Sequence, residues 1–221
     1  MNGVTAALDL YCLGLAGRRR AARSHDRVRA RTQDGRLIAL PLQRWLRDPS
    51  RAEHRLLRDL EGPVLDVGCG PCRHAAALHA RGVAVLGVDI AATAVRLARA
   101  RGAPVLQRSV FDLPPTGSWG SALLLDGNIG IGGDPLLLLA RVATLVRPGG
   151  VALIELEAPG EAARAFRVRL ERAGAVSDWF PWALVGVDGI EALAARCDFE
   201  VTRVEPSRGR WFARLTRAPG P

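Results

Sequence analysis

The stretch VGCGPCRH, at residues 67–74, contains two sets of residues whose types and spacing could do chemistry. Cys69 and Cys72 are separated by two residues, which is the spacing of a redox-active dithiol. Gly68 and Gly70 flank Cys69, and glycines that follow a strand let the backbone approach a ligand closely. The first interpretation predicts thiol–disulfide exchange. The second predicts a cofactor-binding turn in which the cysteines are bystanders.

An acidic residue further along the chain favours the cofactor-binding turn. Asp66 lies near the end of one short apolar run, and Asp89 ends the next, about 20 residues after Gly70. An acid at this spacing is suited to binding ribose hydroxyls. Arg73, however, occupies the place of the last glycine in the dinucleotide fingerprint. The pattern therefore argues against a standard NAD enzyme.

A zinc site is the third chemistry that these residues suggest. The side chains near the turn that could bind zinc are Cys69, Cys72, His74 and His79. A helix expected over residues 72–80 would spread these ligands apart. We therefore expect no metal ion.

Composition indicates one domain with an addition. The chain has 221 residues, of which 48% are hydrophobic, so it can bury a sizeable core without disulfide bonds. Its four cysteines are too few and too scattered for a disulfide scaffold. The longest apolar runs are too short to cross a bilayer, and a charged stretch follows the apolar N-terminal stretch instead of preceding it. These features predict a soluble, cytoplasmic protein with no membrane partner.

The charge of the chain is strongly positive, with a formal value of +9. There is no lysine, so all 31 basic residues are arginines, which is typical of a coding bias and weakens an inference to nucleic acid. Eight arginines crowd residues 18–36. This cluster is explained by a solvated basic face, by an acidic substrate or by nucleic acid.

Short apolar runs alternate with helical segments from residue 64 onward, which predicts βαβ units and a parallel sheet. We expect strands at 64–67, 83–89, 105–107, 122–126 and 151–157, and helices at 72–80, 92–101 and 135–145. These strands must bring the acids and glycines to one edge of the sheet.

The two ends of the chain have different patterns. After a helix at 191–196, residues 199–204 and 211–215 alternate as strands around a turn, which predicts an antiparallel pair. Residues 28–31 and 37–40 flank a turn and predict a hairpin. We expect residues 1–47 to form an appendage or lid, and residues 48–221 to form the core domain, beginning with a capping box at 50–53.

Five segments, in this order, resemble the motifs of class I S-adenosylmethionine-dependent methyltransferases. They are VLDVGCGPC at 64–72, GVDI at 87–90, RSVFDLP at 108–114, LLLDGNIG at 123–130 and LVRPGGVALIE at 145–155. The resemblance covers residues 64–157 and implies an α/β fold. This fold is a Rossmann-like doubly wound sheet, mostly parallel, with an antiparallel C-terminal strand pair.

The resemblance implies which residues bind the cofactor, S-adenosyl-L-methionine. They are Asp66, Gly68, Cys69, Gly70, Asp89, Ile90, Ser109, Val110 and Asp126. The turn at 66–70 would surround the methionine part, near Asp126. Asp89 would bind both ribose hydroxyls, and Ile90 would pack on the adenine.

The adenine edge and the turn depart from the family pattern. Ser109 and Val110 would flank the adenine edge, but Ser109 stands where an acid is usual. Cys72 replaces the third glycine of the first motif. These departures imply either weaker cofactor binding or an adapted pocket.

The acceptor side is less defined, and no catalytic residue is identified. A bound sulfonium is already an activated methyl donor, so the protein chiefly positions the acceptor. Asn128 follows the fourth strand and is a candidate for substrate contact, or it merely builds a turn. His25 and Tyr11 could supply a base if the appendage folds over the site, although a surface position is the simpler expectation for them.

An aromatic cluster follows the fifth strand. Trp179, Phe180 and Trp182 surround Pro181. The cluster is consistent with part of an acceptor pocket, and equally with core packing or a dimer contact.

The sequence therefore predicts a methyltransferase that acts on a small molecule, such as an acidic or specialised metabolite. An RNA methyltransferase that uses the arginine-rich N-terminal part is the first alternative. A non-catalytic or redox-regulated S-adenosylmethionine-binding protein is the second, motivated by Cys72 and Ser109. The acceptor atom and the oligomeric state are not predicted.

Overall fold

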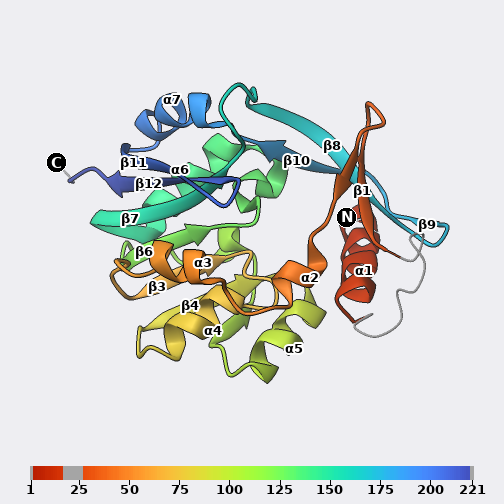
Figure 1. Cartoon of the computed structure of the whole chain (residues 1–221), viewed down its shortest axis with the longest axis horizontal. Coiled ribbons are helices and arrows are strands. Elements are labelled where there is room, and N and C mark those ends of the chain that lie inside the picture. Colours follow the sequence, from red (N-terminus) through yellow and green to blue (C-terminus); the bar gives the residue numbers. More distant parts are fainter. Residues whose placement is uncertain (1, 17–26, 220–221) are drawn as a thin grey trace.

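A computed structural model describes residues 2–16 and 27–219 of the chain. Figure 1 shows a central sheet with helices on both sides, and a second, smaller sheet beside it. The second sheet lies close to the N-terminal helix, so residues from the start of the chain and from its second half are neighbours.

The central sheet has seven strands in the order β11-β12-β7-β6-β3-β4-β5. Their bounds are β3 Val64–Val67, β4 Val85–Asp89, β5 Val105–Gln107, β6 Trp119–Leu124, β7 Val146–Leu156, β11 Phe199–Ser207 and β12 Arg210–Arg217. Strands β3 to β7 are parallel, whereas β12 is antiparallel to β7 and to β11. This arrangement confirms the expected doubly wound sheet and its antiparallel C-terminal pair.

The burial of the central strands explains why they form a parallel sheet. Every residue of β3 is buried, as is expected of a strand covered by helices on both faces. The helices of this layer are α3 Arg51–Leu56, α4 Arg73–His79, α5 Ala92–Ala100, α6 Pro135–Leu145 and α7 Ile190–Ala195. Helix α3 begins at the expected capping box, in which Ser50 and Glu53 bond reciprocally. The short 3₁₀ turns Val110–Asp112, Asn128–Gly133 and Val187–Gly189 complete the connections.

The second sheet has the strand order β10-β8-β1-β2, with β9 paired to β8. Its strands are β1 Arg29–Thr32, β2 Leu37–Ala39, β8 Arg164–Arg172, β9 Ala175–Val176 and β10 Phe180–Leu184. The expected hairpin of β1 and β2 is confirmed. Strands β8 to β10 were missed, because alternating arginines in β8 hide its buried positions, Val168 and Leu170.

Two N-terminal helices, α1 Asn2–Ala16 and α2 Leu42–Trp45, join the two sheets. Leu10 and Leu15 of α1 are buried in a cluster that includes Ala94 of α5 and Val168 of β8. Helix α1 thus lies against both the central domain and the second sheet. Within the described residues, no helix is long and apolar enough to cross a membrane.

Candidate cofactor and acceptor site

The strand order creates a crevice at the carboxyl ends of β3 and β6. The chain proceeds from β3 to β4 on one side and later returns to β6 on the other side of β3. Such a switch point is where open α/β sheets bind ligands. The sequence-predicted turn follows β3, Asp89 ends β4, and Asp126 and Asn128 follow β6, so the structure brings these residues to the same edge.

The turn after β3 requires its glycines. Gly68 and Gly70 both have positive φ, at 63° and 54°. A side chain on Gly68 would contact Ile131 and Asn128. The Asn128 amide donates hydrogen bonds to the carbonyl oxygens of Val67 and Gly68, at 2.8 and 2.9 Å. Asn128 therefore stabilises the turn through its side-chain N–H groups. Contact between its side-chain oxygen and a methyl acceptor stays a prediction.

Asp89 is held by backbone groups on both sides of the turn. Its carboxylate accepts hydrogen bonds from the N–H of Gly70, at 2.8 Å, and of Ala91, at 2.7 Å. Burial raises the pKa of this carboxyl above its ordinary value, against the lowering effect of these hydrogen bonds. These two hydrogen bonds hold the Asp89 carboxylate, a hydrogen-bond acceptor, beside the glycine turn.

The residues predicted to surround the adenine lie next to Asp89 and after β5. Ile90 is 46% exposed, which leaves an apolar side chain without cover beside the predicted ribose site. Val110 is buried, and the Ser109 hydroxyl accepts from the N–H of Phe111 at 3.2 Å. Ser109 thereby caps the following 3₁₀ turn, a structural task that its sequence position did not suggest.

Tyr11 reaches this site from helix α1. Its hydroxyl lies 3.2 Å from the point that a side-chain carbon on Gly70 would occupy, and its ring meets Trp45 edge-on with centroids 6.1 Å apart. Burial, followed by the charge of Asp89, raises the pKa of Tyr11 well above its ordinary value. Tyr11 is therefore a neutral hydrogen-bond donor at neutral pH rather than a base.

A network of three arginines and three carboxylates lies beside the turn, and the sequence interpretation missed it. Its members are Arg44, Arg73, Arg210, Glu53, Asp126 and Glu155. Arg73 is only 3% exposed and is 2.5 Å from Glu53 and 3.1 Å from Asp126. The one available signal was Arg73 in the position of a motif glycine.

Asp126 is the centre of this network. Arg44 and Arg210 each approach its carboxylate to 3.0 Å, in addition to Arg73. Its backbone N–H donates to the Glu155 carboxylate at 2.5 Å. The network thus joins α2, α4 and β12 to the end of β6, and it keeps Asp126 beside the crevice.

Two hydrogen-bond donors near Asp126 and Tyr11 are buried without an acceptor among the described residues. They are Arg44 Nε and Trp45 Nε1, on consecutive residues of α2. A buried donor without a partner has a free-energy cost, which a ligand carboxylate can remove. The two donors suit a ligand carboxylate, the Asp89 carboxylate suits ribose hydroxyls, and the exposed Ile90 suits the flat face of a base.

The two cysteines of the turn are close together. Their Sγ atoms lie 2.8 Å apart, over Gly87, where any side chain would collide with both sulfurs. The hydrogen bond to Cys72, and then burial, raise the pKa of Cys69 well above its ordinary value. A redox-active dithiol needs the opposite shift, so this environment argues against a thiol nucleophile.

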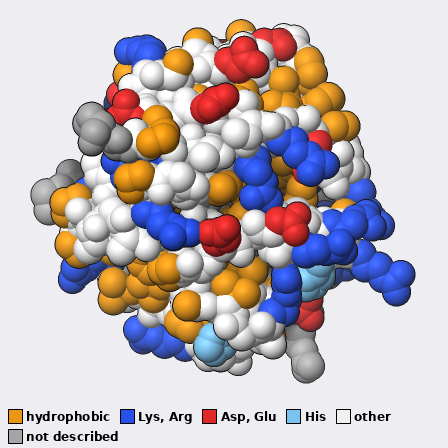
Figure 2. Space-filling model, turned by 90° about the vertical axis from the view of Figure 1, so that its left-hand side faces the viewer, with side chains coloured by type: hydrophobic (Ala, Val, Ile, Leu, Met, Phe, Trp, Pro, Cys, Tyr) orange, Lys and Arg blue, Asp and Glu red, His pale blue; other side chains and the backbone are white. Residues whose placement is uncertain are grey.

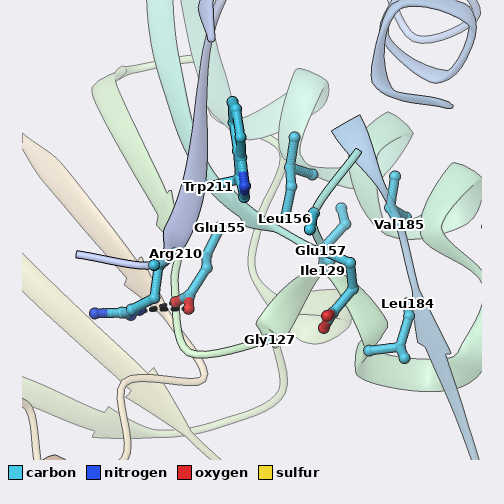
Figure 3. A pocket seen from close by; sticks show the side chains of 11 residues that line it. Gly127, Ile129, Glu155, Leu156, Glu157, Leu184, Val185, Arg210 and Trp211 are labelled. Atoms are coloured by element: carbon cyan, nitrogen blue, oxygen red, sulfur yellow. Dashed lines mark hydrogen bonds and ion pairs between the residues drawn. The ribbon is translucent and has the colours of Figure 1, made fainter. Parts of the chain in front are cut away.

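A cavity of about 170 Å³ adjoins the turn on the β7 side of the crevice (Figure 3). Its lining consists of Gly127, Ile129, Glu155, Leu156, Glu157, Ala158, Leu184, Val185, Gly209, Arg210 and Trp211. Gly127 lies between Asp126 and Asn128, so the cavity begins one residue from the groups that support the turn. None of these lining residues was predicted from the sequence.

The remaining predicted residues lie elsewhere. Phe180 and Trp182 pack beside the cluster that holds α1, as in the core-packing alternative, and are absent from the cavity lining. Trp179 stacks against the Arg169 guanidinium, 4.9 Å from the ring centroid. His25 lies outside the described residues.

Comparisons with known proteins agree with this geometry. Residues 64–150 match the model of a methyltransferase domain. A SAM-dependent methyltransferase from Bacteroides fragilis, solved with S-adenosyl-L-homocysteine, has a TM-score of 0.75 at 24% identity, covering 98% of this chain and 95% of that one. No curated protein matches the sequence.

Two other solved structures are similar over a smaller part of the chain. The 1,6-didemethyltoxoflavin-N1-methyltransferase of Burkholderia thailandensis has a TM-score of 0.56 at 20% identity, with 75% of this chain and 74% of that chain covered. CalS10, an amino pentose methyltransferase from Micromonospora echinaspora, has a TM-score of 0.56 at 18% identity, covering 76% and 88%. Residues 64–150 thus match a methyltransferase-domain model, and the chain as a whole has the fold of these solved S-adenosylmethionine-dependent methyltransferases.

Proposed function

We propose that this protein transfers a methyl group from S-adenosylmethionine to a small-molecule acceptor. The observation that carries the proposal is the division of the crevice. The glycine turn, Asp89 and Ile90 lie on its β4 side, and the cavity that begins at Gly127 lies on its β7 side. One half is suited to the methyl donor and the other to the acceptor.

The residues of the first half fit the donor. Asp89 offers a carboxylate for ribose hydroxyls, and the exposed Ile90 offers an apolar surface for adenine. Arg44, Trp45 and Tyr11 offer N–H and O–H donors for the methionine carboxylate. When bound, S-adenosylmethionine supplies an electrophilic methyl group on a sulfonium. The chain itself positions the acceptor and excludes water.

The second half supports a small acceptor. The cavity is partly open, and apolar side chains of Ile129, Leu184 and Trp211, from three different elements, form part of its lining. Two structural neighbours are named for a toxoflavin precursor and an amino pentose, which are small molecules. A cavity of this kind favours a compact acceptor over a polynucleotide.

The RNA alternative has less support. On the face shown in Figure 2, arginine side chains are interrupted by acidic and apolar ones instead of forming a continuous basic surface. Several arginines face inward, and Arg73 and Arg210 are paired with carboxylates. Their charges are therefore not available to phosphates. Retention of RNA that falls steeply with salt would favour this alternative.

Calorimetry with S-adenosylhomocysteine tests the proposal. The wild-type protein should bind it, and Asp89→Ala should weaken binding by about 1.5–3 kcal/mol, because a charge-assisted contact is lost. Asp59→Asn, at an exposed position in the turn after α3, is the matched control and should leave the affinity unchanged. Absence of heat with well-folded protein would refute donor binding.

A further inference from the structure

The proposed acceptor cavity has a carboxylate and an indole in a lining of mixed polar and apolar character. Glu157 follows the end of β7, and Trp211 is the second residue of β12, which begins after the turn at Gly209. Figure 3 shows the Glu157 carboxylate on the cavity side of its strand, between Ile129 and Leu184. Ile129 and Val185 are almost fully buried behind it.

The charges of the lining are unequally compensated. Arg210 is paired with Glu155, with Nε and Oε1 at 2.6 Å, and also with Glu53 and Asp126. The arginine in the wall is therefore neutralised by its own partners. The Glu157 carboxylate, in contrast, accepts no hydrogen bond from the described residues.

The surroundings of Glu157 favour a positive charge. Glu157 is an exposed residue, although the packing around its base removes part of its solvent. This desolvation, and then Glu155 and Glu161, raise the pKa of Glu157, while Arg36 and Arg164 oppose this shift. The part of this shift that comes from the negative charges of Glu155 and Glu161 would also favour a cation beside Glu157. The indole of Trp211 provides a second favourable surface, because a cation is attracted to the face of an aromatic ring.

We propose that the acceptor is a basic amine with a compact apolar body, and that Glu157 is the residue that selects it by binding its ammonium group beside Trp211. This inference rests on the proposed methyl transfer and replaces the acidic acceptor suggested by the arginine content. An acidic molecule would meet the Glu157 carboxylate, which accepts no hydrogen bond from the described residues, and would be repelled.

The test compares matched probes on protein saturated with S-adenosylhomocysteine. Benzylamine, benzyl alcohol and benzoate share a ring and differ in charge, and so do the corresponding phenethyl compounds. In direct calorimetric titration or ligand-observed NMR, we expect the amines to bind at least about tenfold more tightly than the alcohols. The acids should bind least. A separate reaction with S-adenosylmethionine in place of S-adenosylhomocysteine gives the second readout, methylated amine detected by mass spectrometry. In that reaction the ammonium first loses a proton to the Glu157 carboxylate or to water, and the neutral amine then takes the methyl group and leaves S-adenosylhomocysteine.

Two variants distinguish direct contact between Glu157 and the ammonium group from a general effect of negative charge near the cavity. Glu157→Gln should remove the preference of the cavity for the amine over the alcohol. Glu161→Gln makes the same charge change at an exposed neighbour outside the lining, and it should keep most of that preference.

The outcomes also distinguish this inference from the proposed function. Equal binding of amine and alcohol, preference for the acid, or an unchanged preference in Glu157→Gln would overturn the amine assignment while donor binding persists. Loss of S-adenosylhomocysteine binding in well-folded wild-type protein would instead overturn the proposed function.

Discussion

At the residue scale, Cys69 and Cys72 share one location but not the chemistry that their spacing suggests. The turn needs a left-handed residue at Cys72, whose φ is 56°, where the family pattern has a glycine. The Cys72 N–H donates a hydrogen bond to the Cys69 carbonyl oxygen, at 2.8 Å, which brings the two side chains together. The conformation of the turn is therefore enough to bring the two sulfur atoms together. It does not lower the pKa of the Cys69 thiol, as a redox-active dithiol would require.

Their proximity predicts a disulfide under oxidising conditions. Diamide accepts the two electrons and two protons of the thiol pair, and we expect a Cys69–Cys72 disulfide in peptide mapping by mass spectrometry. Closing the sulfurs from 2.8 Å to the bonded length of about 2.05 Å displaces the turn slightly. S-adenosylhomocysteine affinity should therefore fall by about tenfold at most.

Cys72→Gly restores the motif glycine and serves as the control. Its affinity for S-adenosylhomocysteine should be the same with and without diamide. If both thiols of the wild-type turn remain open to alkylation after treatment, the disulfide prediction is wrong.

At the element scale, the sequence located the strands and helices whose patterns are uninterrupted. The bounds of β5 and α6 match the expected ranges, because Asp134 and Pro135 mark the start of the helix. Strand β6 begins earlier and ends before Asp126, which instead adopts a left-handed turn with φ of 57°. The pattern of an apolar run cannot show where its backbone leaves the sheet.

The ionic network shows why part of the site escaped prediction. Glu53 was recognised only as a member of a capping box. In the structure its carboxylate accepts from Ser50 N–H at 2.8 Å and also pairs with Arg73 and Arg210. These partners come from α4 and β12, and no local spacing in the sequence relates them to α3.

The network should therefore be essential to the packing of α3 on α4. Glu53→Gln keeps the shape and the cap but removes the charge, leaving Arg73 with Asp126 alone. We expect a loss of about 3 kcal/mol in the free energy of unfolding, because one partner of a buried ion pair is lost. Urea denaturation without any ligand measures this.

A surface pair provides the comparison. Glu61→Gln breaks the ion pair with Arg147, in which both side chains are largely exposed, and should cost less than about 1 kcal/mol. Equal effects of the two substitutions would show that burial gives the network no special role.

At the scale of the whole molecule, the central sheet was predictable and the second sheet was not. The order of βαβ units and motifs fixes the positions of β3 to β7 relative to one another. Strand β1 pairs with β8 across most of the chain, for example Ala30 with Leu170. Such a pairing depends on tertiary packing, and so does the cavity between β7, β10 and the β11–β12 turn.

Buried carboxyls also set how the stability of the molecule depends on pH. Burial raises the pKa of Asp66 from 3.8 to about 6, so the native state binds this proton more tightly than the unfolded state. The free energy of unfolding should then rise by about 1.3 kcal/mol as pH falls from 7 to 5, which is part of the rise of about 3 kcal/mol that is complete once the pH is below the unfolded value of 3.8. Urea denaturation at pH 7, 6 and 5 measures this rise.

The opposite sign applies to Glu53, whose pKa is lowered by its partners His74, Arg73 and Arg210 despite burial. Its contribution is present above the unfolded pKa of about 4.5 and is lost as pH falls below it, so stability should be greatest near pH 5. Asp66→Asn separates the two effects. This variant should be more stable than wild type at pH 7 and should gain less stability than wild type from pH 7 to 5, because Asp89 and Glu157 keep their raised pKa values, while the loss below pH 4.5 remains. A wild-type protein that loses stability steadily from pH 7 to 5 would contradict the assignment to Asp66, because a buried carboxyl with a raised pKa can only gain from protonation there.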